Sequence, residues 1–322
     1  MRLLVLGGTR FVGRAVAEAA LGRGWDVTAL HRGLTGALPP DVTALVADRT
    51  DPAALRAALG DTTWDAVLDT WALAPRVARD AAQALTGRVG RAAYVSSRSV
   101  YADMAAARVE SAPVVDGDPD ASARAYAVDK RGGEIAWQAA FPDVLLLRAG
   151  LVLGPHEDVA RLPCWLDRIA RGGRVVAPGR PERPLQLVDA RDLAAFALDA
   201  LAEGLAGPYD VVSAPGHTTT LELLEASGSE AELVWVDEAD LEAAGVQPWT
   251  QLPCWVPETG ELSGLLSGDT FKARAAGLVC RPVEQTVADT WVWVQEAGVP
   301  KGRPGLEPGL SEDLERALLG SV

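Results

Sequence analysis

Short apolar runs alternate with segments of helical periodicity along the first half of the chain. Strands are predicted by the apolar runs at 2–7, 26–31, 42–48, 65–70 and 92–97. Helices are predicted between them at 12–23, 51–60 and 75–87. Apolar strands joined by helices are typical of right-handed βαβ crossovers and of a parallel sheet covered on both faces. The pattern therefore predicts an α/β fold with a doubly wound parallel sheet.

The alternation continues past residue 120 and then loosens. We expect a helix at 123–140, a strand at 144–152, a helix at 160–172, a helix within 184–204 capped by Asp192, and a strand at 209–214 that rejoins the sheet. Pro, Gly and Trp interrupt the segment 217–295. We predict a first domain at 1–155 completed by about 184–215, a smaller C-terminal lobe at 156–183 and 216–299, and a C-terminal tail at 300–322.

The amino-acid composition favours a globular protein and argues against nucleic-acid, membrane and metal partners. The 322 residues, 48% hydrophobic and 23% charged, are typical of a globular chain with a sizeable core. A net charge of −14 repels phosphate backbones and anionic lipid, so we expect no nucleic acid and no membrane partner. The three cysteines and three histidines lack disulfide or metal-ligand spacing, so no metal site is expected. With no signal-peptide pattern and no apolar run of roughly 18 residues, we expect a cytoplasmic protein.

The stretch LGGTRFVG at 6–13 has the form of a dinucleotide-binding turn. It follows the first predicted strand and opens the first predicted helix, where backbone N–H groups and the helix dipole favour an anion. Gly7 suits the tight turn, and Gly13 lets the helix pack closely on the strand. Arg10 stands where a further glycine is usual, and its guanidinium can form a charge-assisted fork with phosphate. The expected cofactor contacts here are Gly7, Thr9, Arg10, Phe11, Val12 and Gly13.

The end of the second predicted strand favours NADP(H) over NAD(H). NAD sites carry an acid there for the ribose hydroxyls, whereas NADP sites carry a nearby arginine for the 2′-phosphate. This strand ends in His31 and Arg32, so Arg32 is the leading 2′-phosphate ligand and Arg10 the second candidate; solvated surface arginines are the alternative. Asp48, in VADRTD, can accept from the adenine amino group or cap the next helix. We also expect the next residue, Arg49, to contact the cofactor.

A catalytic set is indicated by a serine at a strand end and a Tyr/Lys pair on a helix. Tyr126 and Lys130 in YAVDK are four residues apart, which places them on one helix face. A phenol there can lie beside a substrate carbonyl, while the neighbouring ammonium stabilises its phenolate and binds the nicotinamide ribose. The spacing alone is weak evidence, but it follows a glycine turn and the serine-bearing end of the strand at 92–97.

These motifs together resemble the extended short-chain dehydrogenase/reductase superfamily, which contains nucleotide-sugar epimerases and dehydratases. The matching stretches are GGTRFVG, VADRTD, VSSRSVYAD, YAVDK, LLLRAGLVLGP and QLVDARDLA, which span about residues 1–215, and RPVEQTVADTWVW at 281–293. The resemblance implies a Rossmann-type dinucleotide-binding domain with a small substrate lobe, and a homodimer. It makes Tyr126 the acid/base and a cofactor contact, Lys130 its helper and ribose ligand, and Ser97 the hydroxyl partner. It also places Ala149, Gly150 and Leu151 along the nicotinamide, and Thr70, Trp71 and Ala72 beside the ribose and diphosphate.

Two further departures from the superfamily pattern bear on the substrate. The dehydratases follow their active-site hydroxyl with Asp-Glu, but this chain has Arg98 and Ser99, which argues against sugar 4,6-dehydration. Many nucleotide-sugar enzymes carry Arg-Asp-Phe where this chain has Leu185, Gln186 and Leu187, so a nucleotide diphosphate handle is not indicated.

The leading hypothesis is an NADPH-dependent oxidoreductase that reduces a carbonyl of a small molecule, or the reverse oxidation, with Tyr126 as acid/base. The alternative is an NAD(P)-dependent nucleotide-sugar epimerase that uses the same residues. A remote alternative is a non-catalytic cofactor- or RNA-binding protein. Candidate substrate contacts are Trp71, Arg98 and Gln186.

Overall fold

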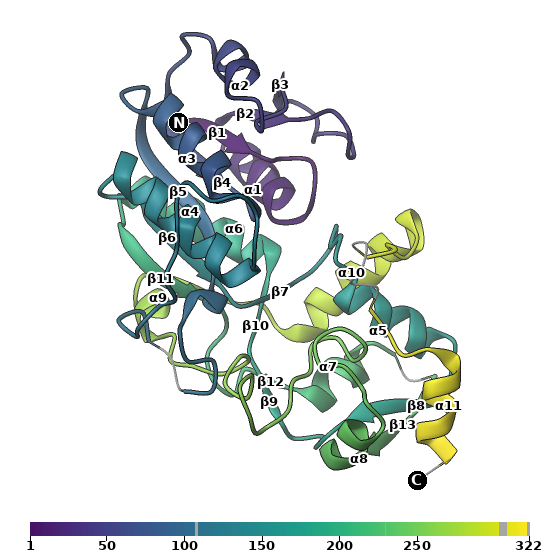
Figure 1. The fold of residues 1–322 in the computed structure, drawn as a ribbon. Coiled ribbons are helices and arrows are strands. Elements are labelled where there is room, and N and C mark those ends of the chain that lie inside the picture. The colour runs from purple at the N-terminus through teal and green to yellow at the C-terminus, as the bar shows by residue number, and fades with distance from the viewer. Residues whose placement is uncertain (107–108, 229, 303–307, 321–322) are drawn as a thin grey trace.

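A parallel sheet forms the centre of the molecule, as the sequence predicts. A computed structural model describes residues 1–106, 109–228, 230–302 and 308–320. Its seven-stranded sheet has the order β11-β6-β5-β4-β1-β2-β3, and all neighbouring strands run parallel (Figure 1). The strands are β1 (Arg2–Leu6), β2 (Asp26–His31), β3 (Thr43–Val46), β4 (Trp64–Asp69), β5 (Val89–Ser97), β6 (Leu145–Ala149) and β11 (Gly207–Val211). The fold is therefore a Rossmann-type α/β fold, and the expected return of the chain to the sheet near residue 209 is confirmed.

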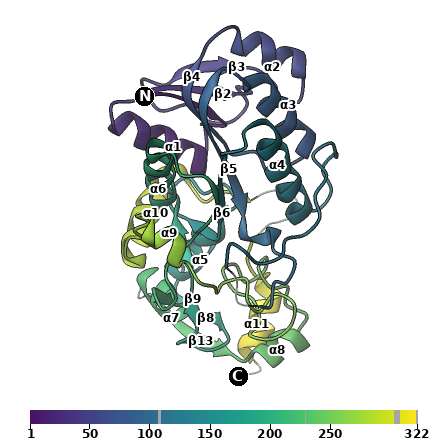
Figure 2. The same cartoon turned by 90° about the vertical axis from the view of Figure 1, so that its left-hand side faces the viewer.

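Helices cover both faces of this sheet (Figure 2). One face carries α1 (Phe11–Gly22) and α6 (Ala190–Glu203), and the other carries α2 (Pro52–Leu59), α3 (Pro75–Leu85) and α4 (Tyr126–Ala140). Side chains alternate across each strand, so Leu3 and Val5 of β1 enter one core while Leu4 and Leu6 enter the other. The central strands β1, β4 and β6 are buried on both faces, which explains their nearly continuous apolar runs, whereas the edge strand β3 is largely exposed.

The strand predicted at 144–152 is broken at Gly150. The chain ends β6 at Ala149 and resumes as β7 (Leu151–Leu153), which leaves the sheet and pairs with β10 (Leu187–Asp189). A Cβ at Gly150 would lie 2.6 Å from Cγ2 of Val212, so only glycine fits this close approach. The break leads the chain from the sheet toward a second hydrophobic core.

Two helix boundaries differ from the prediction. The helix expected from residue 123 begins at Tyr126, as α4. The cap of α6 is Asp189 rather than Asp192, because the Asp189 carboxylate accepts from the Arg191 backbone N–H. Asp192 lies in the first turn and instead accepts from the backbone and side chain of Arg281.

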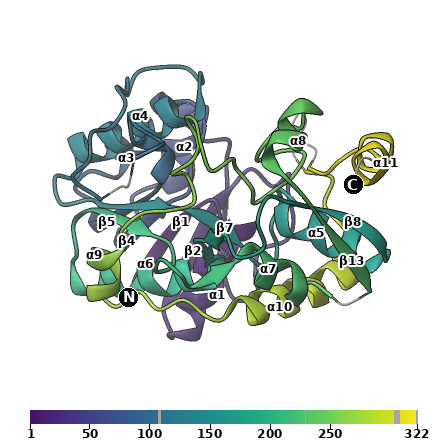
Figure 3. The same ribbon diagram turned by 90° about the horizontal axis from the view of Figure 1, so that it is seen from below.

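The second core lies beyond one end of the sheet (Figure 3). It is built on β8 (Gly173–Pro178) paired with β13 (Ala231–Val236), and on the short pair β9 (Pro184–Leu185) and β12 (Thr218–Thr219). The helices that pack there or beside it are α5 (Arg161–Ala170), α7 (Thr220–Ala226), α8 (Glu238–Ala243), α10 (Val283–Ala297) and α11 (Glu312–Gly320). Among the described residues, no helix is long and apolar enough to cross a bilayer.

The packing adds detail to the predicted division of the chain. Leu318 of α11 is buried in the second core, so the described part of the predicted tail is packed there; residues 303–307 and 321–322 lie outside the described residues. The helix α9 (Phe271–Ala275) instead contributes Ala273 to the core of the parallel sheet, although the sequence places it in the substrate lobe. The domain boundaries themselves remain a prediction.

Candidate functional site

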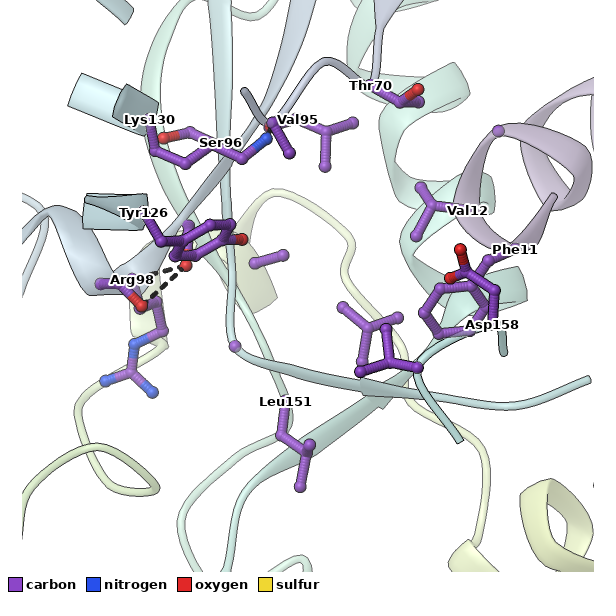
Figure 4. A pocket seen from close by; sticks show the side chains of 18 of the residues that line it. Phe11, Val12, Thr70, Val95, Ser96, Arg98, Tyr126, Lys130, Leu151 and Asp158 are labelled. Carbon is purple, nitrogen blue, oxygen red and sulfur yellow. Dashed lines mark hydrogen bonds between the residues drawn. The ribbon is translucent and has the colours of Figure 1, made fainter. Parts of the chain in front are cut away.

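A cavity of about 550 Å³ lies at the carboxyl ends of the central strands (Figure 4). Gly7 follows β1, Thr70 follows β4, Ser97 ends β5 and Ala149 ends β6, and all four line it. In open parallel sheets this edge is where ligands bind. Of the residues predicted for a site, the lining includes Gly7, Thr9, Arg10, Phe11, Val12, Gly13, Thr70, Ala72, Ser97, Arg98, Tyr126, Lys130, Ala149, Gly150 and Leu151.

The glycine turn has the geometry of a phosphate cradle. Gly7 has φ of +100°, and a Cβ at Gly13 would lie only 1.7 Å from the carbonyl oxygen of Gly7. The first turn of α1 is therefore seated directly against the strand end. Arg10 occupies the cap position, no described side chain caps the helix, and its first turn contains no acid, so its positive end faces the cavity. These features fit a dinucleotide diphosphate.

Arg10 lies at this turn and reaches across the cavity. Its guanidinium pairs with the carboxylate of Asp158 at 3.4 Å, and both residues line the cavity. About half of the Arg10 side chain is exposed, so the pair is only weakly stabilising. A diphosphate bound at the turn would offer Arg10 a more strongly charged partner.

Substitution of Gly13 by alanine should disrupt this cradle. The added methyl group would meet backbone atoms, which cannot rotate away, so we expect a loss of about 3 kcal/mol in the free energy of unfolding. We also expect cofactor binding, measured by calorimetry, to be lost. Gly22→Ala is the matched control, because a Cβ there meets nothing within 4 Å in the same helix. Wild-type cofactor affinity in Gly13→Ala would contradict the cradle.

Lys130 is held at the cavity by backbone carbonyls of two strand ends. Its Nζ donates to the carbonyl oxygen of Trp71 at 2.7 Å and to that of Val95 at 2.5 Å, and lies 4.9 Å from the centre of the Tyr94 ring. The helix can approach this closely because a Cβ at Gly133 would lie 2.3 Å from the Tyr94 hydroxyl. Lys130 therefore lines the cavity with its ammonium fixed by these carbonyls.

Tyr126 and Ser97 present the hydroxyls of the predicted catalytic set. Tyr126 is the first residue of α4, is 51% exposed, and points its hydroxyl into the cavity (Figure 4). Ser97 caps a short 3₁₀ helix (Arg98–Val100) and exchanges hydrogen bonds with Ser99, whose N–H and hydroxyl each lie 3.1 Å from its Oγ. Ser96 donates to the buried carboxylate of Glu134, whereas the hydroxyl of Ser97 is bonded to Ser99, which also lines the cavity. The structure thus brings the phenol, the ammonium and the hydroxyl to one cavity.

Arg98 and Gln186 do not have the geometry of substrate contacts. Arg98 lines the cavity, but its guanidinium turns away from it, toward Asp210 at 3.2 Å and the Ser267 carbonyl at 2.6 Å (Figure 4). Gln186 is buried, lies outside the lining, and donates to the carbonyls of Ser213 and Gly268. Both side chains connect the sheet to the segment around residue 267, a packing role that their sequence context did not reveal.

Arg49 and Trp71 also serve the fold instead of lining the cavity. The Arg49 guanidinium is buried and makes two hydrogen bonds, of 2.6 and 2.9 Å, to the fully buried carboxylate of Asp69. The Trp71 ring lies 5.0 Å from this guanidinium, and its indole N–H donates to the carbonyl of Ala74. Only the Trp71 carbonyl serves the site, through its hydrogen bond to Lys130.

The predicted adenosine contacts lie outside this cavity. Arg32 is exposed just after β2, near enough to Asp48 for its charge to act on that carboxylate. Asp48 is exposed and accepts from the backbone and hydroxyl of Thr50, and these hydrogen bonds lower its pKa. Asp48 therefore forms a local turn with Thr50 and does not cap the next helix, because the cap of α2 is Asp51. Its contact with adenine remains a prediction.

The structure adds lining residues to those predicted for the site. Val95, Ser96, Ser99 and Val152 lie close to predicted residues in the sequence. The others come from the loop before α5, the start of α5 and the irregular segment after α8, and are Asp158, Val159, Arg161, Trp249 and Leu265. Charged residues within the loop and helix start that follow Gly154-Pro155 were the available signal for Asp158 and Arg161. Within the described residues, no group of three His, Cys, Asp or Glu side chains has the arrangement of a metal site.

Comparison with known proteins agrees with this architecture. A sequence model of the NAD dependent epimerase/dehydratase family matches residues 3–87 and 75–212, which includes the glycine turn, Ser97, Tyr126 and Lys130. No curated protein matches the chain.

Solved structures share the fold over most of their length. WbmH of Bordetella bronchiseptica, solved with NAD+, is 21% identical with a TM-score of 0.69 over 92% of this chain and 99% of that one. WbmG of the same organism, solved with NAD and UDP, is 18% identical with a TM-score of 0.67 over 96% and 97%. UDP-glucose 4-epimerase of Thermus thermophilus, solved with NAD, is 20% identical with a TM-score of 0.65 over 92% and 100%. At these identities the likeness shows the fold alone.

Proposed function

The chain belongs to the NAD dependent epimerase/dehydratase family, and on that premise we propose that it is an enzyme that epimerises a secondary alcohol of a nucleotide sugar. The proposal rests on one observation: Tyr126, Lys130 and Ser97 line the same cavity as the glycine turn. The UDP-glucose 4-epimerase among the solved structures supports the epimerase assignment over simple carbonyl reduction. The missing Asp-Glu pair after Ser97 argues against a dehydratase.

A nicotinamide ring bound along Ala149, Gly150 and Leu151 would supply the hydride acceptor and donor that amino-acid side chains lack. Tyr126 would take the proton of the substrate hydroxyl as that carbon is oxidised, and would return a proton on reduction. The Lys130 ammonium stabilises the phenolate in between, and Ser97 donates to the substrate oxygen. An epimerase carries out both half-reactions, oxidation and then reduction, on the same substrate molecule. Its net consumption of cofactor is therefore zero.

A second candidate is the reduction of a carbonyl compound with net consumption of NADPH. The observation that favours it is the burial of the positions where many nucleotide-sugar enzymes carry Arg-Asp-Phe. Leu185 and Leu187 pack in the second core, and Gln186 is held by backbone carbonyls. The nearby Arg183 pairs with Glu238 at 2.8 Å and is also occupied by the carbonyl of Val256. None of these side chains is available for a diphosphate.

Cofactor stoichiometry separates the two candidates. Nucleotide sugars and carbonyl compounds are each incubated with the enzyme and NAD(P)H or NAD(P)+, and both cofactor absorbance and product stereochemistry are followed. An epimerase gives a new stereoisomer with no net change in absorbance, whereas a reductase oxidises one NADPH per product. Failure of every nucleotide sugar to change configuration, together with carbonyl-dependent NADPH oxidation, would replace the epimerase assignment by the second candidate.

The cofactor is proposed to be NADP(H) in preference to NAD(H), because β2 ends in His31 instead of an acid and the next residue, Arg32, is exposed. Arg32→Glu should weaken NADPH binding by about 10- to 100-fold, since a charge-assisted contact becomes a repulsion. NADH affinity should change little, and it serves as the internal control in the same calorimetric titration. Equal losses for both cofactors would contradict a 2′-phosphate contact. Two of the similar solved structures, WbmH and the UDP-glucose 4-epimerase, contain NAD, so a preference for NADPH would distinguish this chain from them.

We further propose a cytoplasmic homodimer, as in the superfamily that the sequence resembles. In that superfamily two helices of each subunit, including the helix that carries Tyr126, commonly form the interface. Sedimentation of the purified chain would give its mass directly, and a monomer at micromolar concentration would contradict this arrangement.

A further inference from the structure

Arg161 approaches the cavity from the side of the second core. It is the first residue of α5, whose Leu162, Trp165 and Leu166 are buried in that core. Its guanidinium carbon lies 4.7 Å from the centre of the Trp249 ring, and both residues line the cavity. A guanidinium stacked on an indole keeps its N–H edges available for a planar, bidentate partner.

The other cationic side chains that line the cavity already have partners. Arg10 pairs with Asp158, Arg98 with Asp210, and Lys130 donates to two carbonyls. Within the described residues, the Arg161 guanidinium has neither an ion pair nor a hydrogen bond.

Glu157, an acid whose charge interacts with that of Arg161, forms its hydrogen bonds with the backbone. Its carboxylate is fully buried and accepts from the N–H groups of Arg161 and Leu162. Burial raises the pKa of Glu157 to about 7, against the opposing effect of the Arg161 charge. Glu157 therefore fixes the start of α5 through the backbone and forms no hydrogen bond with the Arg161 guanidinium.

Trp249 is held rigidly under this guanidinium. Its φ of +66° is a left-handed conformation that a bulky residue rarely adopts. The surrounding chain fixes it, because its N–H donates to the carbonyl of the buried Trp255 at 2.9 Å and the adjacent Pro248 bridges to Leu252. Strain retained in this way at a cavity wall is typical of a binding site.

We propose that Arg161 binds an anionic group of the substrate, a phosphate or a carboxylate, against the face of Trp249. This inference deepens the proposed function and rests on it to the extent that the cavity receives the substrate. The side chains at 183–187 are engaged in packing and internal hydrogen bonds, so they do not reach a substrate diphosphate. With Arg161 as the anion ligand, the anionic group is held from the start of α5 instead. The apolar side chains of Val159 and Leu265 line the same cavity, as does Asp158, whose carboxylate pairs with Arg10.

The test compares charged and neutral probes in matched pairs. Protein saturated with its tighter-binding cofactor, NADP+ or NAD+, is titrated calorimetrically with UDP and uridine, and with D-glucuronate and D-glucose. We expect one anion to bind about 10- to 100-fold more tightly than its neutral counterpart. The UDP pair reports a phosphate and the glucuronate pair a carboxylate.

Variants of Arg161 test whether its side chain causes the preference for the anionic probe. Arg161→Gln should remove it while leaving cofactor affinity unchanged, and Arg161→Lys should retain part of it, since lysine keeps the charge but not the fork. Arg171→Gln is the matched control, because Arg171 caps the other end of the same helix, is exposed, and lies outside the cavity. Melting temperatures establish that each variant is folded.

Several results would overturn the inference: wild-type protein without an anion preference, Arg161→Gln that retains it, or Arg161→Gln that weakens the cofactor as much as the anion. The last result would place the guanidinium at the cofactor diphosphate. Selective UDP binding without turnover of any nucleotide sugar would instead overturn the proposed function and leave the Arg161 assignment intact.

Discussion

Replacement of Tyr126 by phenylalanine should lower kcat by about 10²- to 10⁴-fold, the contribution of a positioned proton donor. The ring of Tyr126 stays at the start of α4 while the one hydroxyl that points into the cavity from this helix is removed (Figure 4). Steady-state rates on the substrate identified by the cofactor test give the measurement. Cofactor affinity should be unchanged, because Lys130 and the glycine turn are untouched.

A matched control separates this loss from a general effect of removing a phenol. Tyr209→Phe deletes a hydroxyl from a residue that packs edge-to-face against Phe196 and lies outside the cavity, so its kcat should equal that of the wild type. Residual activity in Tyr126→Phe at the level of this control would remove Tyr126 from the acid/base role.

Breaking the buried pair between Arg49 and Asp69 should cost about 3–5 kcal/mol of the free energy of unfolding. In Arg49→Met the Asp69 carboxylate stays fully buried and keeps only neutral donors, the N–H groups of Trp71 and Trp137. A buried charge without a counter-charge is expensive, and the large effect follows from this residual charge. Urea denaturation of the single variant measures it.

A second variant tests that explanation. Arg49→Met combined with Asp69→Asn removes both charges while the Asn carbonyl can still accept from Trp137, so the double variant should be more stable than Arg49→Met alone. Arg171→Met, which breaks an exposed pair with Asp167, should lose less than about 1 kcal/mol. A double variant no more stable than Arg49→Met would show that the loss comes from packing instead of charge.

The sheet and the catalytic set follow from patterns that are local in the sequence. Strands such as β2 are buried on both faces and therefore read as apolar runs, and the expected ends of β2 agree with the structure. Tyr126 and Lys130 are found by their helical spacing, and Ser97 by its position at a strand end. The expected family and α/β fold are confirmed by the family match and the sheet order.

The interactions that escaped prediction depend on residues distant in the sequence. Arg49 lies beside a predicted adenine contact, and only the fold reveals that Asp69, twenty residues on, takes its guanidinium. Gln186 likewise meets Ser213 and Gly268 across the fold. Choosing between caps only three residues apart, Asp189 and Asp192, requires knowing where the backbone turns.

The substrate end of the cavity was the hardest part to predict. Trp249 and Leu265 come from an irregular segment without periodicity, so nothing in their neighbourhood indicates that they face the glycine turn across a cavity. Arg161 begins a helix whose apolar face is evident, but the direction of its own side chain depends on the stack with Trp249.

A crystal structure of the protein with NADPH tests the central claim most directly. We expect the diphosphate at the N–H groups of α1, the 2′-phosphate beside Arg32, and the nicotinamide ring within reach of the Tyr126 hydroxyl along Gly150. A cofactor bound away from the glycine turn, or a nicotinamide ring separated from Tyr126 by protein, would contradict the account.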